Sequence, residues 1–177
     1  LDPKRSDCRY PYKELSCCGV GFKLCQGLNT IYKIPESELF DLTDLLAISI
    51  AADIVAMTGE NRVLAKLGLK TLRKTRNLGL RLLIPQEKIS TFDISNIVFE
   101  IAPKINAAGR ISHGKAAVKL MISENLKQAH QIVGDILDLN DSRRELDTNI
   151  TISATNQVIE TNQEKNCSTI VYRPEWN

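Results

Sequence analysis

The chain has 177 residues, a formal net charge of +2, 43% hydrophobic residues and only 5% aromatic residues. This length suits one domain or a domain and a fraction, with a core built from Leu, Ile, Val and Ala. A net charge so close to zero does not by itself indicate a class of binding partner. Because we find no signal peptide, no lipidation signal and no apolar stretch of about 18 residues, we expect a cytoplasmic protein that does not enter a membrane.

The cysteines argue against a zinc site and against a disulfide framework. Their number is odd, and no pair is spaced Cys-x-x-Cys. We expect them to be small, reduced side chains in a reducing cytosol. The five are Cys8, Cys17, Cys18, Cys25 and Cys167.

Apolar residues recur at helical spacing through most of the chain. After an extended arm over residues 1–12, the spacing predicts a helix from Tyr12 to about Thr30. A second helix is predicted from Pro35 to Ala51, and a third from Glu60 to about Arg76.

The next segment is predicted to be more broken. Residues 80–83 form a short apolar turn. A further helix starts near Thr91, is interrupted at Pro103 and gives way to a turn at Gly109, because Pro and Gly are the usual helix breakers. A short helix over residues 115–122 follows.

From Glu124 onwards the apolar positions keep to one face for about 35 residues, which at 1.5 Å per residue would give a helix of roughly 50 Å. A helix of that length often connects two bodies, although two ordinary helices broken near Asn140 fit the pattern equally well. Residues 169–172 predict a β-strand, which needs a sheet that the rest of the chain does not supply. We therefore predict a mainly α chain cut from a longer protein.

The segment "LLAISIAADIVAM", residues 45–57, places one carboxylate, Asp53, in the most apolar run of the chain. Burying an ionised carboxylate costs several kcal/mol unless something pairs with it. Asp53 could cap a helix or turn, pair with a buried Arg, or bind a divalent cation. If it is a metal ligand, the other ligands must lie outside this chain, because no other acidic or His cluster is visible.

A second candidate is "PKINAAGRISHG", residues 103–114. Small residues let a backbone or ligand approach Asn106 and Arg110 closely, and the Arg guanidinium suits phosphate oxygens. The alternative is a helix C-terminus with a Gly cap and a surface Arg. His113 alone is a weak candidate for a base or ligand.

The third candidate is a basic stripe, which we define as Arg62, Lys66, Lys70 and Arg73. These residues step by four, four and three along the third predicted helix and so share one face. A solvated helix face is the plainer interpretation. A second acid-poor segment at residues 101–119 favours a phosphate-bearing partner.

Several segments resemble the RecJ-type exonucleases of the DHH phosphoesterase superfamily. The resemblance rests on "AADIVAMTGENRVLAKLGLKTLR", "FEIAPKINAAGRISHGKAAVKLMISEN" and "LNDSRRELD", and extends to both ends of the chain. It implies the helical C-terminal part of a DHH-type α/β domain (residues 1–122), a long connecting helix (residues 123–162) and the start of a DHHA1 domain with its first β-strand (residues 163–177).

The resemblance also implies roles for the candidate residues. Asp53 falls on the Asp of an Ala-Asp-Val-Val-Pro motif that holds a two-metal Mn²⁺ or Mg²⁺ centre, whose remaining ligands lie upstream. Asn106 and Arg110 fall on a motif whose Arg faces the DNA end and the phosphate near the metals. This chain has Ala56 where the motif has Pro, and Ser49-Ile50 where Gly-Thr often precedes it. The basic stripe would follow the strand backbone.

The implied activity is metal-dependent 5′-to-3′ degradation of single-stranded DNA in repair and recombination, with single-strand-binding protein and repair helicases as partners. The chain alone is expected to be inactive. One alternative is another DHH phosphodiesterase that acts on short oligonucleotides or cyclic dinucleotides. The other is a non-catalytic helical module that binds nucleic acid, in which Asp53 only caps or pairs.

Overall fold

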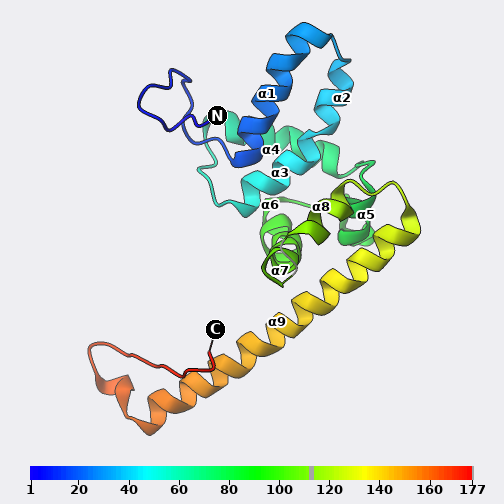
Figure 1. The fold of residues 1–177 in the computed structure, drawn as a ribbon. Coiled ribbons are helices and arrows are strands. Elements are labelled where there is room, and N and C mark those ends of the chain that lie inside the picture. Colours follow the sequence, from blue (N-terminus) through cyan, green and yellow to red (C-terminus); the bar gives the residue numbers. More distant parts are fainter. Residues whose placement is uncertain (112–113, 177) are drawn as a thin grey trace.

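The structure, a computed structural model, describes residues 1–111 and 114–176 and is built from helices (Figure 1). This confirms the mainly α prediction. The helices are α1 (Cys17–Tyr32), α2 (Glu36–Asp41), α3 (Thr43–Ala52), α4 (Gly59–Leu72), α5 (Leu78–Leu83), α6 (Ile94–Asn96), the π-helical turn Ile97–Ile101, α7 (Ala102–Ile111), α8 (Lys115–Met121) and α9 (Leu126–Glu160), with 3₁₀ turns at Gln86–Lys88 and Gln163–Lys165.

Helix α3 lies at the centre and joins two hydrophobic clusters. Ala47, Ile48 and Ala51 pack with residues of α4, α5, α8 and α9 on one side. Leu46 and Ile50 pack with α1 and α4 on the other. A helix buried on both sides must be apolar around most of its circumference, which explains why the segment before Asp53 is so hydrophobic.

Helix α4 packs closely along α3, in the opposite direction. A Cβ built on Gly68 would lie 2.2 Å from the carbonyl oxygen of Thr43 and 2.6 Å from Cβ of Ala47. Only glycine therefore allows the two backbones to approach this closely. The end of α4 thus lies beside the start of α3, and the start of α4 lies near Asp53.

Several predicted helix boundaries are wrong for local reasons. Helix α1 begins at Cys17 and not at Tyr12, because the Ser16 hydroxyl caps it by accepting a hydrogen bond from Gly19 N at 3.1 Å. The second predicted helix is two helices, divided at Leu42. Residues 78–83 form the short helix α5, capped by Asn77, whose side chain accepts from Leu80 N.

The predicted interruption at Pro103 is also wrong, because the chain stays helical across it. The π-helical turn Ile97–Ile101 comes directly before α7, so that Pro103 falls in the first turn of that helix. Proline lacks the N–H of a regular helix and crowds the turn before it, and the wider π-helical turn directly before α7 accommodates both effects. The turn predicted at Gly109 is absent as well, since α7 runs on to Ile111.

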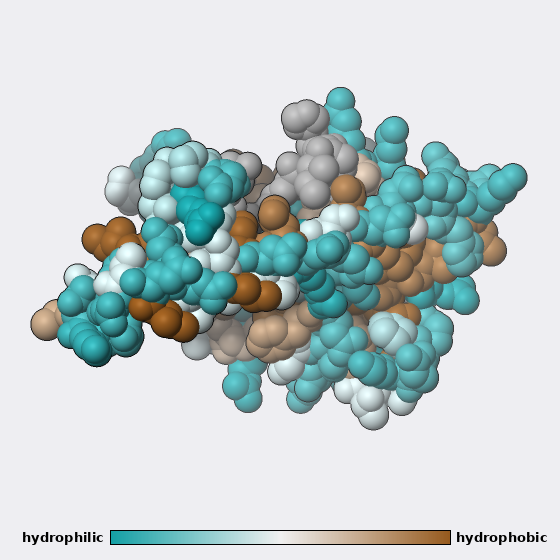
Figure 2. Space-filling view, turned by 90° about the horizontal axis from the view of Figure 1, so that it is seen from below, coloured by the Kyte–Doolittle hydropathy of each residue, from teal (hydrophilic) through white to brown (hydrophobic). Residues whose placement is uncertain are grey.

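Helix α9 is one continuous helix of 35 residues, so of the two alternatives the long helix is confirmed. Its first half packs on the body through Ala129, Val133 and Ile136, whereas the second half projects away from the other helices (Figure 1). On that half Leu146 and Ile152 are more than 50% exposed. Seen from below, the surface carries hydrophobic patches between polar side chains (Figure 2).

The C-terminal segment folds back beside the end of α9 (Figure 1). Residues 169–173 form no strand within the part of the chain that the structure describes. Ile170 N instead donates to the Gln163 side chain at 2.9 Å, and no described segment pairs with residues 169–173 as a strand. Among the described residues, none of the helices combines the length and apolar character required to cross a membrane.

Candidate functional site

Asp53 lies at the C-terminal cap of α3 and is exposed to solvent. The carboxylate therefore does not share the burial of the apolar run that precedes it. Helix α3 ends at Ala52, and the chain turns outward just after the last buried residue, Ala51. No buried Arg is needed to neutralise this group, because water reaches it.

The position of Asp53 is nevertheless electrostatically unusual for an acid. The C-terminal end of a helix carries a partial negative charge, which favours cations and disfavours carboxylates. No described Lys or Arg forms an ion pair with Asp53. The Ser49 hydroxyl, one turn earlier, donates a hydrogen bond to Oδ2 at 2.9 Å. The carboxylate is therefore oriented and attractive to a cation.

The residue after Asp53 has a strained backbone. Ile54 has a φ of +52° and is 90% exposed. A β-branched residue in the left-handed region costs on the order of 1–3 kcal/mol, and such strain concentrates at functional sites. The strain turns the chain away from α3 immediately beyond the carboxylate.

Two polar side chains fix the loop that leads from Asp53 to α4. The Tyr12 hydroxyl donates to the Thr58 carbonyl at 2.8 Å, and the buried Asn61 amide donates to the Ala56 carbonyl at 3.0 Å. Gly59 has a φ of +44°, and a Cβ there would lie 2.7 Å from the Tyr12 ring. Residue spacing gives no sign of these roles, because the Tyr12 contact spans 46 residues and Asn61 also donates to the Glu14 carbonyl, 47 residues away.

Helix α7 carries the second candidate segment. Asn106 is exposed on this helix, and its neighbour Ala107 is fully buried. The backbone of Arg110 is helical, which corrects the tight turn predicted around it. The side chain of Arg110 and all of His113 lie outside the described part of the structure. Their predicted roles therefore stay predictions.

A cavity of about 230 Å³ connects α7 with the Asp53 turn. Its wall includes Ala52 and Ile54, the two residues that flank Asp53, together with Asn106. The fold thus brings together two sequence segments that lie more than fifty residues apart. A further wall residue, Arg143 of α9, was not predicted as a site residue.

The basic stripe divides into two kinds of residue. Arg62, Lys66 and Lys70 are exposed on the solvent face of α4. Arg73, just past the end of α4, instead donates to the carbonyl of Phe92 through Nη2 at 3.0 Å and Nε at 3.3 Å. Arg73 therefore holds a loop in place, a contact that the helical spacing alone could not indicate.

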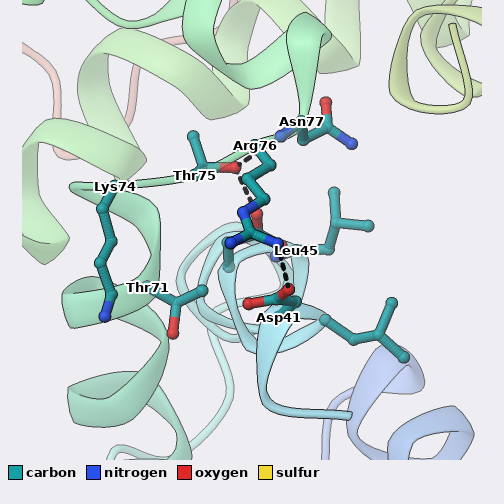
Figure 3. A pocket seen from close by; sticks show the side chains of 9 residues that line it. Asp41, Leu45, Thr71, Lys74, Thr75, Arg76 and Asn77 are labelled. Atoms are coloured by element: carbon teal, nitrogen blue, oxygen red, sulfur yellow. Dashed lines mark hydrogen bonds and ion pairs between the residues drawn. The ribbon is translucent and has the colours of Figure 1, made fainter. Parts of the chain in front are cut away.

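A larger cavity, of about 340 Å³, lies at the opposite end of α3 (Figure 3). Arg76 reaches across it towards Asp41, with 3.9 Å between the charged groups. Asp44, on the same wall, is buried and accepts hydrogen bonds from the Thr75 hydroxyl and Leu45 N. Burial raises the pKa of the Asp44 carboxyl, against the opposing effect of the Thr75 hydrogen bond. The Thr75 bond ties α3 to the loop after α4, which gives Asp44 a structural role.

The donor chemistry of Asp53 suits Mg²⁺ or Mn²⁺, which prefer oxygen ligands. A single carboxylate, however, fills only a small part of an octahedral shell of six oxygen atoms. No group of three or more His, Cys, Asp or Glu residues that could hold a metal occurs in residues 1–111 and 114–176. The described residues can therefore contribute one ligand to a metal centre but cannot build one.

Known proteins similar to this chain are single-stranded-DNA-specific exonucleases. They carry the name RecJ. The protein of Bacillus subtilis is 37% identical over 182 residues, covering all of this chain and 22% of the relative. That of Thermus thermophilus is 33% identical over 130 residues, covering 73% of this chain and 19% of the relative. No family model matches the chain.

Solved structures give the same result. A crystal structure of exonuclease RecJ bound to manganese aligns with this chain at 30% identity and a TM-score of 0.74. The alignment covers 84% of this chain and 38% of the chain in that crystal structure. RecJ from Thermus thermophilus in complex with Mg²⁺ aligns at 28% identity and a TM-score of 0.71. This alignment covers 82% of this chain and 23% of the Thermus chain. The chain is thus related to a segment of RecJ, and spans roughly a fifth to a third of the curated relatives.

Proposed function

We propose that this chain is part of a metal-dependent exonuclease that degrades single-stranded DNA from the 5′ end, and that Asp53 supplies one ligand of its Mn²⁺ or Mg²⁺ centre. The observation that carries the proposal is the placement of Asp53. An exposed carboxylate stands at the negative end of α3, with one oxygen held by Ser49. That arrangement favours a cation that other parts of the protein help to bind.

The remaining candidate residues are assigned to the DNA. Asn106 and Arg110 lie on α7, which places them on the helix whose side chains line the cavity beside the Asp53 turn. We assign both to phosphate oxygens near the scissile bond, because amide and guanidinium groups donate hydrogen bonds to such oxygens. The exposed stripe residues Arg62, Lys66 and Lys70 are assigned to the strand backbone further away.

Bound cations would supply an activated water and neutralise charge on the phosphate. In that setting Asp53 holds a cation at a fixed place, and the hydrogen bond from Ser49 limits rotation of the carboxylate. The two loop contacts made by Tyr12 and Asn61 hold the Asp53 turn in one conformation and so maintain the strained backbone of Ile54.

The proposal extends to the organisation and setting of the protein. Residues 1–122 are assigned to a DHH-type domain, residues 123–162 to the connecting helix and residues 163–177 to the start of a DHHA1 domain. The continuity of α9 supports the middle assignment. We further propose a cytoplasmic role in DNA repair and recombination, with single-strand-binding protein and helicases as partners.

The test uses the complete protein with strands labelled at either end. We expect Mn²⁺- or Mg²⁺-dependent release of nucleotides from the 5′ end of a single strand, and little degradation of a blunt duplex. Preferential cleavage of dinucleotides or cyclic dinucleotides would support a different phosphodiesterase of the same superfamily. Metal-independent binding without cleavage would support a non-catalytic module and overturn the proposal.

The chain alone is expected to show no nuclease activity, since one carboxylate cannot assemble a two-metal site. Pure 177-residue protein is incubated with labelled single-stranded DNA and Mn²⁺ for this purpose. Its circular dichroism should first show the helical signal that the structure requires. Metal-dependent degradation by this chain would contradict the assignment of the missing ligands to other parts of the protein.

A further inference from the structure

The cavity beside the Asp53 turn contains a positively charged side chain from a third segment, α9. Arg143 lines it together with Asn106 of α7 and Ile54, while Ala51, Ala52 and Ala102 keep that wall free of bulky groups. Its volume, about 230 Å³, is several times the roughly 30 Å³ that one water occupies in the liquid. The cavity can therefore admit a small polar group.

The direction of Arg143 follows from the way α9 packs. Ile136 and Asn140 are buried at 0% and 3% exposure, and Arg143 lies three residues after Asn140 on the same face of the helix. Arg144 is rotated by about 100° from it and is exposed. The core packing of the first half of α9 thus places Arg143 at the wall of the cavity, whereas Arg144, which lies within electrostatic range of Lys104 on α7, does not line it.

Arg143 has no structural contact comparable to that of Arg73. Within the part of the chain that the structure describes, its guanidinium donates no hydrogen bond. In the same part of the chain its one ion pair joins Nε to Oδ2 of Asp147 at 3.5 Å, and the Asp147 side chain is 61% exposed. Such an exposed pair within one helix contributes little energy. A half-buried guanidinium at the wall of a cavity is therefore available to an anion.

We propose that Arg143 binds a backbone phosphate of the single strand in this cavity, together with the amide of Asn106. The planar guanidinium offers two parallel N–H groups to phosphate oxygens, and a side-chain amide can add a further donor. The inference rests on the proposed function for the identity of the ligand. It adds the connecting helix to the DNA-binding surface, which would make α9 a direct contact as well as a connection.

The test compares Arg143→Ala with Arg144→Ala in the complete protein. The two arginines are adjacent and equally charged, but only Arg143 lines the cavity. Affinity for a labelled single strand is measured across a salt series without divalent cations, so that no strand is cleaved. We expect Arg143→Ala to weaken binding roughly tenfold and to lower the log–log salt slope by about 0.7, the loss of one phosphate contact. Arg144→Ala should leave both quantities unchanged.

Two additional measurements separate a phosphate contact from damage to the fold. Arg143→Lys keeps the positive charge but lacks the two parallel N–H groups of the guanidinium. This variant should therefore keep the wild-type salt slope and bind with an affinity between those of wild type and Arg143→Ala. Strands carrying one uncharged methylphosphonate at successive positions should identify a single position at which Arg143→Ala costs nothing further. A cost that persists at every position would overturn the proposal, as would equal effects of the two alanine variants.

Failure of this inference is distinguishable from failure of the proposed function. Wild-type protein that degrades single strands from the 5′ end, combined with an Arg143→Ala variant of normal affinity and slope, would overturn the assignment of Arg143 alone. Wild-type protein that neither binds nor degrades single strands would overturn both.

Discussion

The two ends of α3 carry carboxylates in opposite environments. At the start of the helix, Asp44 is 5% exposed and accepts hydrogen bonds from Thr75 and Leu45. At the other end, Asp53 is exposed and, among the described residues, accepts one hydrogen bond, from Ser49. The acid that is expensive to bury is therefore Asp44, whereas hydropathy alone points to Asp53.

This difference shows how a structural carboxylate is distinguished from a candidate ligand. Asp44 lies at a helix N-terminus, where negative charge is favourable, and its hydrogen bonds compensate for burial. Asp53 lies at a helix C-terminus, where negative charge is unfavourable, and one of its oxygens has no described partner. A cation would relieve the second arrangement but is not needed for the first.

The largest expected effect separates the two acids by activity. In the complete protein Asp53→Asn should lower turnover by at least about three orders of magnitude, equivalent to roughly 4 kcal/mol, because the amide no longer neutralises a cation. Asp44→Asn, the matched control at the other end of α3, should retain most turnover. The measurement is the rate of strand degradation at limiting Mn²⁺, with circular dichroism to show that both variants fold. Near-normal activity of Asp53→Asn would exclude it as a ligand.

The second effect concerns the close packing at the Asp44 end. Gly68→Ala should destabilise the fold by about 2–4 kcal/mol, because the added methyl group would overlap the Thr43 carbonyl. Gly21→Ala in α1 is the control, since a Cβ there meets nothing within 4 Å, and it should stabilise the helix by about 0.5–1 kcal/mol. Urea unfolding followed by the helical circular dichroism signal measures both. Equal behaviour of the two variants would contradict the packing of α4 on α3.

The third effect is a pH dependence of stability that comes from Asp44. Its folded-state pKa is raised above the ordinary value of 3.8, mainly by burial. The folded protein therefore holds this proton more tightly than the unfolded chain, and the associated stability is present below that value and lost as pH rises through the raised pKa. Asp44→Asn should remove this loss, so its stability relative to wild type should improve from about pH 4 upwards. A relative stability that falls over this range would give the opposite sign and refute the assignment.

The smallest expected effects come from replacing one basic residue near each end of α3. Arg73→Ala should lower stability by about 1 kcal/mol, because the Phe92 carbonyl loses its two hydrogen bonds. Arg62→Ala, nearer the Asp53 end, should change stability by less than about 0.5 kcal/mol and lower the salt slope of single-strand binding by about 0.7. Urea unfolding and a salt series on both variants would measure these two quantities. If Arg73→Ala lowered the salt slope and left stability unchanged, Arg73 would belong to the same DNA-facing surface as the other stripe residues.

The sequence by itself determined the features that depend on local periodicity. It predicted a mainly α chain and the shared exposed face of Arg62, Lys66 and Lys70 on α4, and it offered an unbroken helix of about 35 residues as one of two alternatives at α9, because the positions of side chains on a helix follow directly from their spacing. It also singled out Asp53 and Asn106, whose segments the structure places beside one cavity. Caps and compensating turns at Ser16, Leu42 and Pro103 shifted the predicted boundaries, because they act over one turn and leave little trace in hydropathy.

Only the tertiary structure decided which polar side chains are structural and which are available to a ligand. Asp44, Asn61 and Arg73 are used by the fold, through hydrogen bonds to residues as far as 47 positions away in the chain. Asp53 and Arg143 lie where elements end or project, and there the packing leaves polar groups accessible. Long-range packing makes this selection because a side chain's environment is set by the elements that meet around it, and residue spacing along one helix carries no information about them.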